Sequence, residues 1–197
     1  MCALHQTRWI SILELQITSG QYMPGNRRSI RLPEYDYTSA GAYFVTICAQ
    51  NRQCIFGDVH DHAVVLSPAG ITIHEEWMRT QEIRPHVKLD YFVIMPNHLH
   101  GILIFTDHQE DKDFQPVPSR KPRSHRAKGS LGSVIAGFKS SCTTRINQER
   151  GTPRQPVWQT RFWDRVVRND EELERLREYI KTNPFRWELD SLNPRNV

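Results

Sequence analysis

The pattern of hydrophobic and polar positions divides the chain into short strands and longer helices. Residues 42–48 are rich in β-branched and aromatic side chains, which predicts a central strand. A shorter apolar run at residues 63–66 predicts a second strand. Ser67 and Pro68 follow it and suit the N-cap and the first turn of a helix, which we expect to reach about Thr80.

Two further apolar runs, residues 91–95 and 102–105, are separated by a bend at a Pro-Asn pair. Their composition predicts two strands. His98 and His100 belong to this β-type sequence, and side chains two residues apart in a strand point to the same face. Both imidazoles could therefore bind one metal ion. Composition and spacing support an ordinary pair of half-buried histidines about equally well.

Two helices are predicted in the C-terminal third of the chain. In residues 131–150, apolar side chains recur at intervals of four, three and four residues, the spacing of one helix face. The second helix starts at Asn169, which has a glutamate three residues later as in a capping box. It should stop before Pro184, which also biases Asn183 away from helical geometry. Tyr179 lies at the edge of its apolar stripe, four residues before Asn183. These two side chains can share one helix face.

Composition indicates a single globular domain in a reducing compartment. Hydrophobic residues make up 38% of the 197 residues, enough for one core. No apolar run approaches the roughly 18 residues that a membrane span needs, so we expect a soluble, cytoplasmic protein without membrane contact. The four cysteines form no Cys-x-x-Cys pair and no disulfide framework.

The net charge of +4 favours a polyanionic partner. Residues 107–130 form a flexible charged insertion whose second half is basic, and it suits a solvated loop and a phosphate-contacting arm equally well. In residues 157–168 aromatic side chains alternate with arginines, as in proteins that stack bases and hold phosphates of single strands. Core tryptophans beside surface arginines are an equal alternative. The candidate DNA contacts are Arg120, Lys121, Arg123, Arg126, Lys128, Lys139, Arg145, Trp158, Arg161, Arg165 and Arg168.

Several segments, taken in order, resemble one known family. The segments are MPNHLHGIL, then GFKS on an apolar-basic helix, then VWQTRFWDRVVRND, then REYIKTNPFRW. They resemble the single-tyrosine transposases with a His-hydrophobic-His motif, and are most similar to the REP-associated tyrosine transposases of bacteria. The resemblance covers about residues 26–187. It leaves residues 1–25 as a candidate mobile extension and residues 188–197 as a C-terminal tail.

The resemblance implies an α+β fold of the ferredoxin-like type, with an antiparallel sheet that carries the histidines and a packed helix that carries the tyrosine. It also implies an enzyme that cleaves and rejoins single-stranded, hairpin-bearing DNA through a 5′-phosphotyrosine intermediate. Position by position, His98 and His100 match the metal ligands and Tyr179 matches the nucleophile. Asn183 matches a further polar ligand, where insertion-sequence members often have glutamine.

The metal and the activity leave alternatives open. Two imidazoles alone suit zinc, copper, iron or nickel, whereas the resemblance implies Mg²⁺ or Mn²⁺, because phosphate and Asn183 add oxygen ligands. A non-enzymatic, domesticated DNA-binding protein could keep the same fold. A zinc hydrolase would need a further histidine or carboxylate ligand beside His98 and His100. The protein could act as a monomer or as a homodimer.

Overall fold

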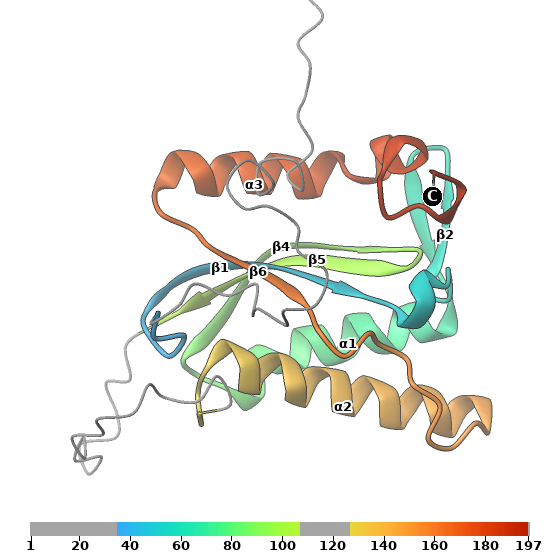
Figure 1. The fold of residues 1–197 in the computed structure, drawn as a ribbon, viewed down its shortest axis with the longest axis horizontal. Coiled ribbons are helices and arrows are strands. Elements are labelled where there is room, and N and C mark those ends of the chain that lie inside the picture. Colours follow the sequence, from blue (N-terminus) through green and yellow to red (C-terminus); the bar gives the residue numbers. More distant parts are fainter. Residues whose placement is uncertain (1–34, 107–126, 197) are drawn as a thin grey trace, which may run out of the picture.

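A four-stranded antiparallel sheet forms the centre of the fold (Figure 1). The computed structural model describes residues 35–106 and 127–196. In spatial order the strands are β4 (Val87–Met95), β5 (His98–Phe105), β1 (Gly41–Cys48) and β6 (Trp163–Val166). The first and third strands of this sheet along the chain, β1 and β5, therefore lie in its middle.

Helices cover both faces of the sheet. Helix α1 (Pro68–Ile83) leads from β1 toward β4, and helix α2 (Leu131–Arg150) leads from β5 toward β6. Figure 1 shows both helices on one face, with α3 (Asp170–Thr182) on the other. This β-α-β-β-α-β order confirms the predicted ferredoxin-like α+β fold in a single domain.

Smaller elements surround this framework. A two-stranded hairpin precedes α1, and short 3-10 helices follow β1 and α3. The hairpin consists of β2 (Gly57–His60) and β3 (Ala63–Leu66). The 3-10 helices are η2 (Gln50–Arg52), η3 (Pro184–Leu189) and η4 (Pro194–Asn196). None of the helices within residues 35–106 and 127–196 is long and apolar enough to cross a membrane.

Side-chain caps fix where the helices begin. The Ser67 hydroxyl accepts a hydrogen bond from the backbone N–H of Gly70 at 3.1 Å, at the start of α1. At the start of α3, Asn169 Oδ1 accepts from the N–H of Glu172 at 2.8 Å. The Glu172 carboxylate in turn accepts from the N–H of Arg168. The first hydrogen bond of the predicted capping box is therefore present, whereas Glu172 bonds to the N–H of the residue before the N-cap instead of the N-cap itself.

The larger core lies between the sheet and the pair α1 and α2. Trp77 of α1 is fully buried against Gly101 of β5, and a Cβ at Gly101 would lie only 2.5 Å from the Trp77 ring. Gly101 therefore allows the helix to approach the sheet closely. On the opposite face a smaller cluster joins the sheet to α3. Its buried members are Phe44, Ile102, Leu176 and Ile180.

The charged insertion is only partly within the described residues. Residues 107–126, with Arg120, Lys121, Arg123 and Arg126, lie outside them, as does the extension at residues 1–25. The last four residues of the insertion, 127–130, turn into α2. Ser130 is buried there, and its hydroxyl accepts a hydrogen bond from the N–H of Ser133.

Candidate active site

His98 and His100 lie side by side in the buried space between β5 and α3. Because side chains alternate along a strand, they share the face of β5 that also carries Ile102. His98 is 0% exposed and His100 is 3% exposed, and their ring centroids are 4.5 Å apart. Phe44, on the neighbouring strand, stacks on the His100 ring. The sheet therefore brings the two imidazoles together as predicted.

Asn97 holds His98 in one tautomer. The Asn97 amide nitrogen donates to the backbone carbonyls of Arg52 at 3.1 Å and Leu192 at 2.7 Å, which fixes the orientation of the amide. Its oxygen lies 2.8 Å from His98 Nδ1, and an amide oxygen can only accept. His98 Nδ1 therefore carries the proton, and the Nε2 lone pair is left available. Such support of a histidine by a neighbouring polar group is usual at metal sites.

His100 contacts a hydroxyl group through each ring nitrogen. Nδ1 lies 2.8 Å from the Thr46 hydroxyl, and Nε2 lies 3.3 Å from the Tyr179 hydroxyl. The ring centroids of His100 and Tyr179 are 5.1 Å apart. The helix that carries the tyrosine therefore sets its hydroxyl directly against the histidine strand.

Burial keeps both imidazoles neutral. It lowers the pKa of His100 from about 6.5 to about 3. Burial also lowers the pKa of His98, and the nearby His100 and Arg52 act in the same direction. Neutral imidazole is the form that binds a metal ion.

Tyr179 stays protonated in this environment. Burial raises the pKa of its hydroxyl above the usual value of 10, and the Asp190 carboxylate raises it further. A hydrogen bond from the Asn183 side chain and the charge of Arg186 act in the opposite direction.

Asp190 is a site residue that the sequence did not reveal. The turn made by η3 brings it back to the histidines, with Asp190 Oδ2 3.9 Å from His98 Nε2. The ligand atoms of His98, His100 and Asp190 all lie within 4.8 Å of one another. Burial raises the pKa of the Asp190 carboxyl, while the Leu192 N–H, Asn183 and Arg52 lower it. No spacing rule marks an acid seven residues beyond Asn183, in a segment that we expected to be a tail.

Asn183 completes the buried polar cluster. It is 3% exposed, and its Oδ1 has no hydrogen-bond partner among the described residues. We expected Pro184 to bias Asn183 away from helical geometry, and this was wrong. Asn183 has φ −58° and ψ −44°, and η3 continues directly from α3. The side chain therefore stays on the α3 face that carries Tyr179.

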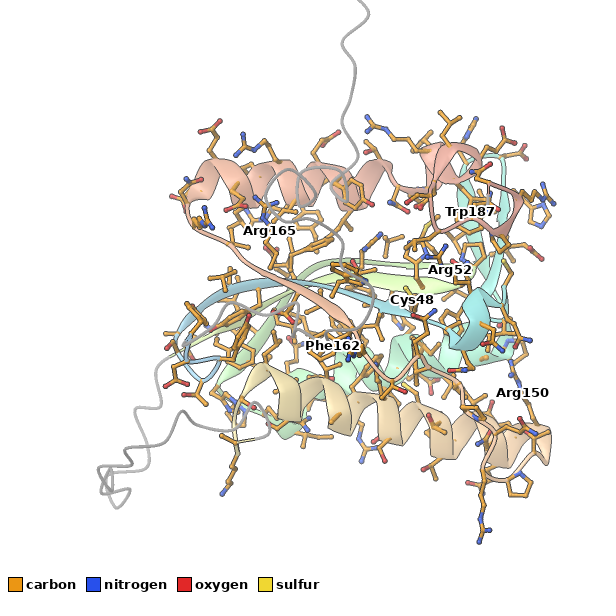
Figure 2. The ribbon with its side chains drawn as sticks, in the orientation of Figure 1. Cys48, Arg52, Arg150, Phe162, Arg165 and Trp187 are labelled. Atoms are coloured by element: carbon orange, nitrogen blue, oxygen red, sulfur yellow. The ribbon has the colours of Figure 1, made fainter. Side chains whose placement is uncertain are left out.

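Arg52 brings a positive charge to the site and was also missed. Figure 2 shows Arg52 near Cys48, the residue opposite His98 in the register, with Trp187 of η3 across from them. Its backbone adopts a left-handed φ of 54° in the tight turn after β1. Its charge reaches His98 and Asp190, since it lowers the pKa of both. A cation beside the site suits a phosphate substrate.

The predicted DNA contact of Trp158 is wrong. It was predicted to stack on DNA bases, but it is only 6% exposed and packs between Phe56 and Phe138 in the larger core. A base cannot reach its faces. The alternative of a core tryptophan therefore holds for this residue.

The described candidate cations differ in their surroundings. Lys139 Nζ donates to the backbone carbonyls of Gln159 at 2.8 Å and Arg161 at 3.1 Å. Arg145 pairs with Glu75 and Glu76 of α1, on the face of the sheet away from the histidines. DNA contacts by these residues stay predictions.

Arg165 lies on the face of the sheet that carries α3. Figure 2 shows Arg165 between β6 and α3, where it pairs with Glu172. The side chains of Lys128, Arg161 and Arg168 are exposed.

The comparisons with known proteins agree with this geometry. No family model matches the chain. An uncharacterized protein of Haemophilus influenzae is 36% identical over 171 residues, which cover 85% of this chain and 93% of that protein. The chain belongs to the same family as this Haemophilus protein. The two chains are therefore similar over most of their length.

The fold has a counterpart among solved structures. The structure of a REP-associated tyrosine transposase bound to a REP hairpin matches with a TM-score of 0.54 and 20% identity, and covers 83% of this chain and 74% of that one. A putative transposase from Deinococcus radiodurans matches with a TM-score of 0.43 and 12% identity, over 75% of this chain and 93% of that one. The first of these matches shows that the chain has the same fold as the REP-associated tyrosine transposase.

Proposed function

We propose that the protein is a single-tyrosine transposase that cleaves and rejoins single-stranded DNA carrying a hairpin. The observation that carries the proposal is the contact between the Tyr179 hydroxyl and His100 Nε2, beside His98 on the same face of the sheet. A nucleophilic hydroxyl and two neutral imidazoles in one buried site suit phosphoryl transfer. The shared fold with a transposase that binds a REP hairpin supports the proposed substrate.

The residues of the site fit a divalent metal ion. His98 Nε2 and Asn183 Oδ1 are both buried, and neither has a hydrogen-bond partner among the described residues. The Asp190 carboxylate lies beside them. Two nitrogen and two oxygen donors leave room for phosphate oxygens, and the oxygen donors favour Mg²⁺ or Mn²⁺. When bound, such an ion supplies Lewis-acid polarisation of the scissile phosphate.

Tyr179 performs the covalent step. Its oxygen attacks phosphorus, a Tyr179–phosphate ester bond forms, and the bond between phosphorus and the 3′-oxygen breaks. The phenol loses its proton, and the departing 3′-oxygen gains one. The 5′-phosphotyrosine conserves the energy of the phosphodiester bond, so attack by a 3′-hydroxyl rejoins DNA without ATP. Arg52 stabilises the negative charge of the phosphate during both steps.

Covalent capture of labelled DNA tests the proposal. The protein is incubated with hairpin-bearing single-stranded DNA labelled at its 3′ end, the end that a 5′-phosphotyrosine retains, together with Mn²⁺, and the products are separated on a denaturing protein gel. We expect a labelled protein band for wild type and no band for Tyr179→Phe, since one hydroxyl is lost. Tyr91→Phe is the matched control, because Tyr91 is 41% exposed and its ring lies under Arg177 and Lys181.

The outcomes separate the candidate functions. A band of wild-type strength from Tyr179→Phe would overturn the assignment of the nucleophile. Loss of the band in His98→Ala and His100→Ala would support the metal site. DNA binding without any band from wild type would favour the non-enzymatic DNA-binding protein.

A zinc hydrolase is the second candidate function. The observation that favours it is Asp190, because two histidines and a carboxylate form a common catalytic zinc set. Such an enzyme would cleave its substrate with zinc and leave no protein–DNA adduct. The labelled band therefore distinguishes the two enzymes.

A further inference from the structure

An exposed tryptophan lies on the same face of the sheet as the histidines. Trp163 is the first residue of β6 and is 39% exposed. In the strand register Trp163 is opposite Thr46, and Thr46 is opposite His100. Residues directly opposite each other on paired strands point to the same side. Trp163, Thr46 and His100 therefore form one row across the sheet.

The row places Trp163 close to the chemistry. Neighbouring strands lie about 4.8 Å apart, so the backbones of Trp163 and His100 are about 10 Å apart. A single strand with the B-DNA spacing of about 3.4 Å per nucleotide crosses that distance in about three nucleotides. The ring therefore lies within reach of bases beside the scissile phosphate.

The two other aromatic residues of the segment are placed differently. Trp158 is buried in the larger core. Phe162 packs against that core, and the Lys139 ammonium lies 5.6 Å from its ring centroid. Of the three rings, Trp163 is the one exposed on the catalytic face.

Trp163 is also held in a fixed position. The backbone just before it is tied to α2 by the two hydrogen bonds from Lys139 to Gln159 and Arg161. Two residues after it, Arg165 pairs with Glu172 of α3. A surface that is already ordered loses little conformational freedom when a ligand binds.

We propose that Trp163 stacks on an unpaired base of the DNA strand that enters the catalytic site. This inference rests on the proposed function. An unpaired base has a free face, whereas bases in a duplex stack on each other, so an aromatic platform selects single-stranded DNA. Arg161 and Arg168 are exposed on either side of β6 and can pair with the flanking phosphates.

Binding of two labelled DNA probes tests the proposal by fluorescence anisotropy. One probe is a hairpin with a single-stranded flank, and the other is the same hairpin without a flank. We expect Trp163→Ala to weaken binding of the flanked probe by about 5- to 150-fold, the usual effect of losing one base-stacking side chain. Binding of the blunt hairpin should stay unchanged. Trp163→Phe keeps a ring and should retain most of the affinity.

A control variant and a second readout make the test specific. Ile83→Ala removes a side chain that is 55% exposed at the end of α1, on the other face, and should bind both probes like wild type. 2-Aminopurine at one position of the flank should be quenched by wild type and not by Trp163→Ala. Equal affinity of wild type and Trp163→Ala for the flanked probe would overturn the proposal. An equal loss for both probes would overturn it as well.

The covalent band separates this proposal from the function on which it rests. The adduct formed by wild type reports the proposed catalysis, whereas the affinity for the flanked probe reports the stacking role of Trp163. If wild type forms no adduct but still loses flank binding in Trp163→Ala, the proposed catalysis fails and the stacking role stands. If adduct forms without any dependence of flank binding on Trp163, the stacking role fails alone.

Discussion

Asn97 links one histidine of the site to two segments that lie far apart in the chain. Its oxygen sets the tautomer of His98, and its nitrogen holds the carbonyls of Arg52 and Leu192. Asn97 is 1% exposed, so water cannot replace it as the hydrogen-bond partner of these groups. One amide therefore orients the His98 ring and holds the backbone of Arg52 and of the segment after Asp190.

We predict that Asn97→Ala weakens both metal binding and folding. Each buried group left without a partner costs about 1–3 kcal/mol, and loss of a residue that orients a ligand lowers metal affinity about 10- to 100-fold. Calorimetric titration with Mn²⁺ and urea unfolding measure the two effects. Nitrogen NMR of the His98 ring in the metal-free protein reports the tautomer directly. An unchanged Mn²⁺ affinity together with an unchanged tautomer would contradict the role of Asn97.

Part of the site could be predicted residue by residue, and part could not. Alternation along a strand brought His98 and His100 together, and helical spacing joined Tyr179 to Asn183. Asp190 and Arg52 approach the site through tight turns, and local sequence periodicity does not describe where a turn directs the chain. Their contribution could only be seen once the backbone was placed.

Among the elements, long periodic segments were easier to predict than short ones. The helix expected at residues 131–150 is present with the same bounds as α2. Strands β2 and β6 were missed, since each has only four residues and both carry polar side chains. Strand β6 forms because β1 offers it a free edge, which is a tertiary effect.

At the element scale, Lys139 of α2 makes folding stability depend on pH. Burial lowers its pKa to about 8, compared with about 10.4 for a lysine in an unfolded chain. Between these two values the unfolded state binds more protons than the folded state. Through this group the free energy of unfolding therefore rises with pH across that window, by at most about 1.4 kcal/mol per pH unit.

Urea unfolding between pH 7.5 and 10.5 checks this prediction. Lys139→Met removes the titrating group, so its free energy of unfolding should rise less with pH than that of wild type. Lys128→Met, at an exposed position, controls for the loss of one charge and should follow wild type. Identical pH dependence in Lys139→Met and wild type would show that Lys139 titrates normally in the folded protein.

Across the whole molecule, the two faces of the sheet differ in what packs against them: one holds the larger core and the other holds the candidate site. The face toward α1 and α2 holds the larger core, including Trp77, Phe138 and Trp158. The face toward α3 holds only a small apolar cluster beside the polar site. Stability of the fold and placement of the reactive groups are therefore supported mainly by different layers.

We predict that α3 opens more readily than α2. Fewer buried apolar contacts hold α3, and local opening follows local packing. Hydrogen exchange followed by mass spectrometry should show faster exchange in residues 170–182 than in residues 131–150. Leu176→Ala, which removes a side chain that is 3% exposed in this cluster, should accelerate exchange in α3 further. Equal protection of both helices in wild type would contradict the prediction.

The tyrosine and the histidines that meet in the site belong to one polypeptide. His100 comes from β5 and Tyr179 from α3 of the same chain, with their side chains in direct contact. In genetic terms, the site is inherited as one unit. Under the proposed function, two defective alleles, one altered at His100 and the other at Tyr179, are therefore expected not to complement each other in the same cell, because one chain supplies both residues of each site.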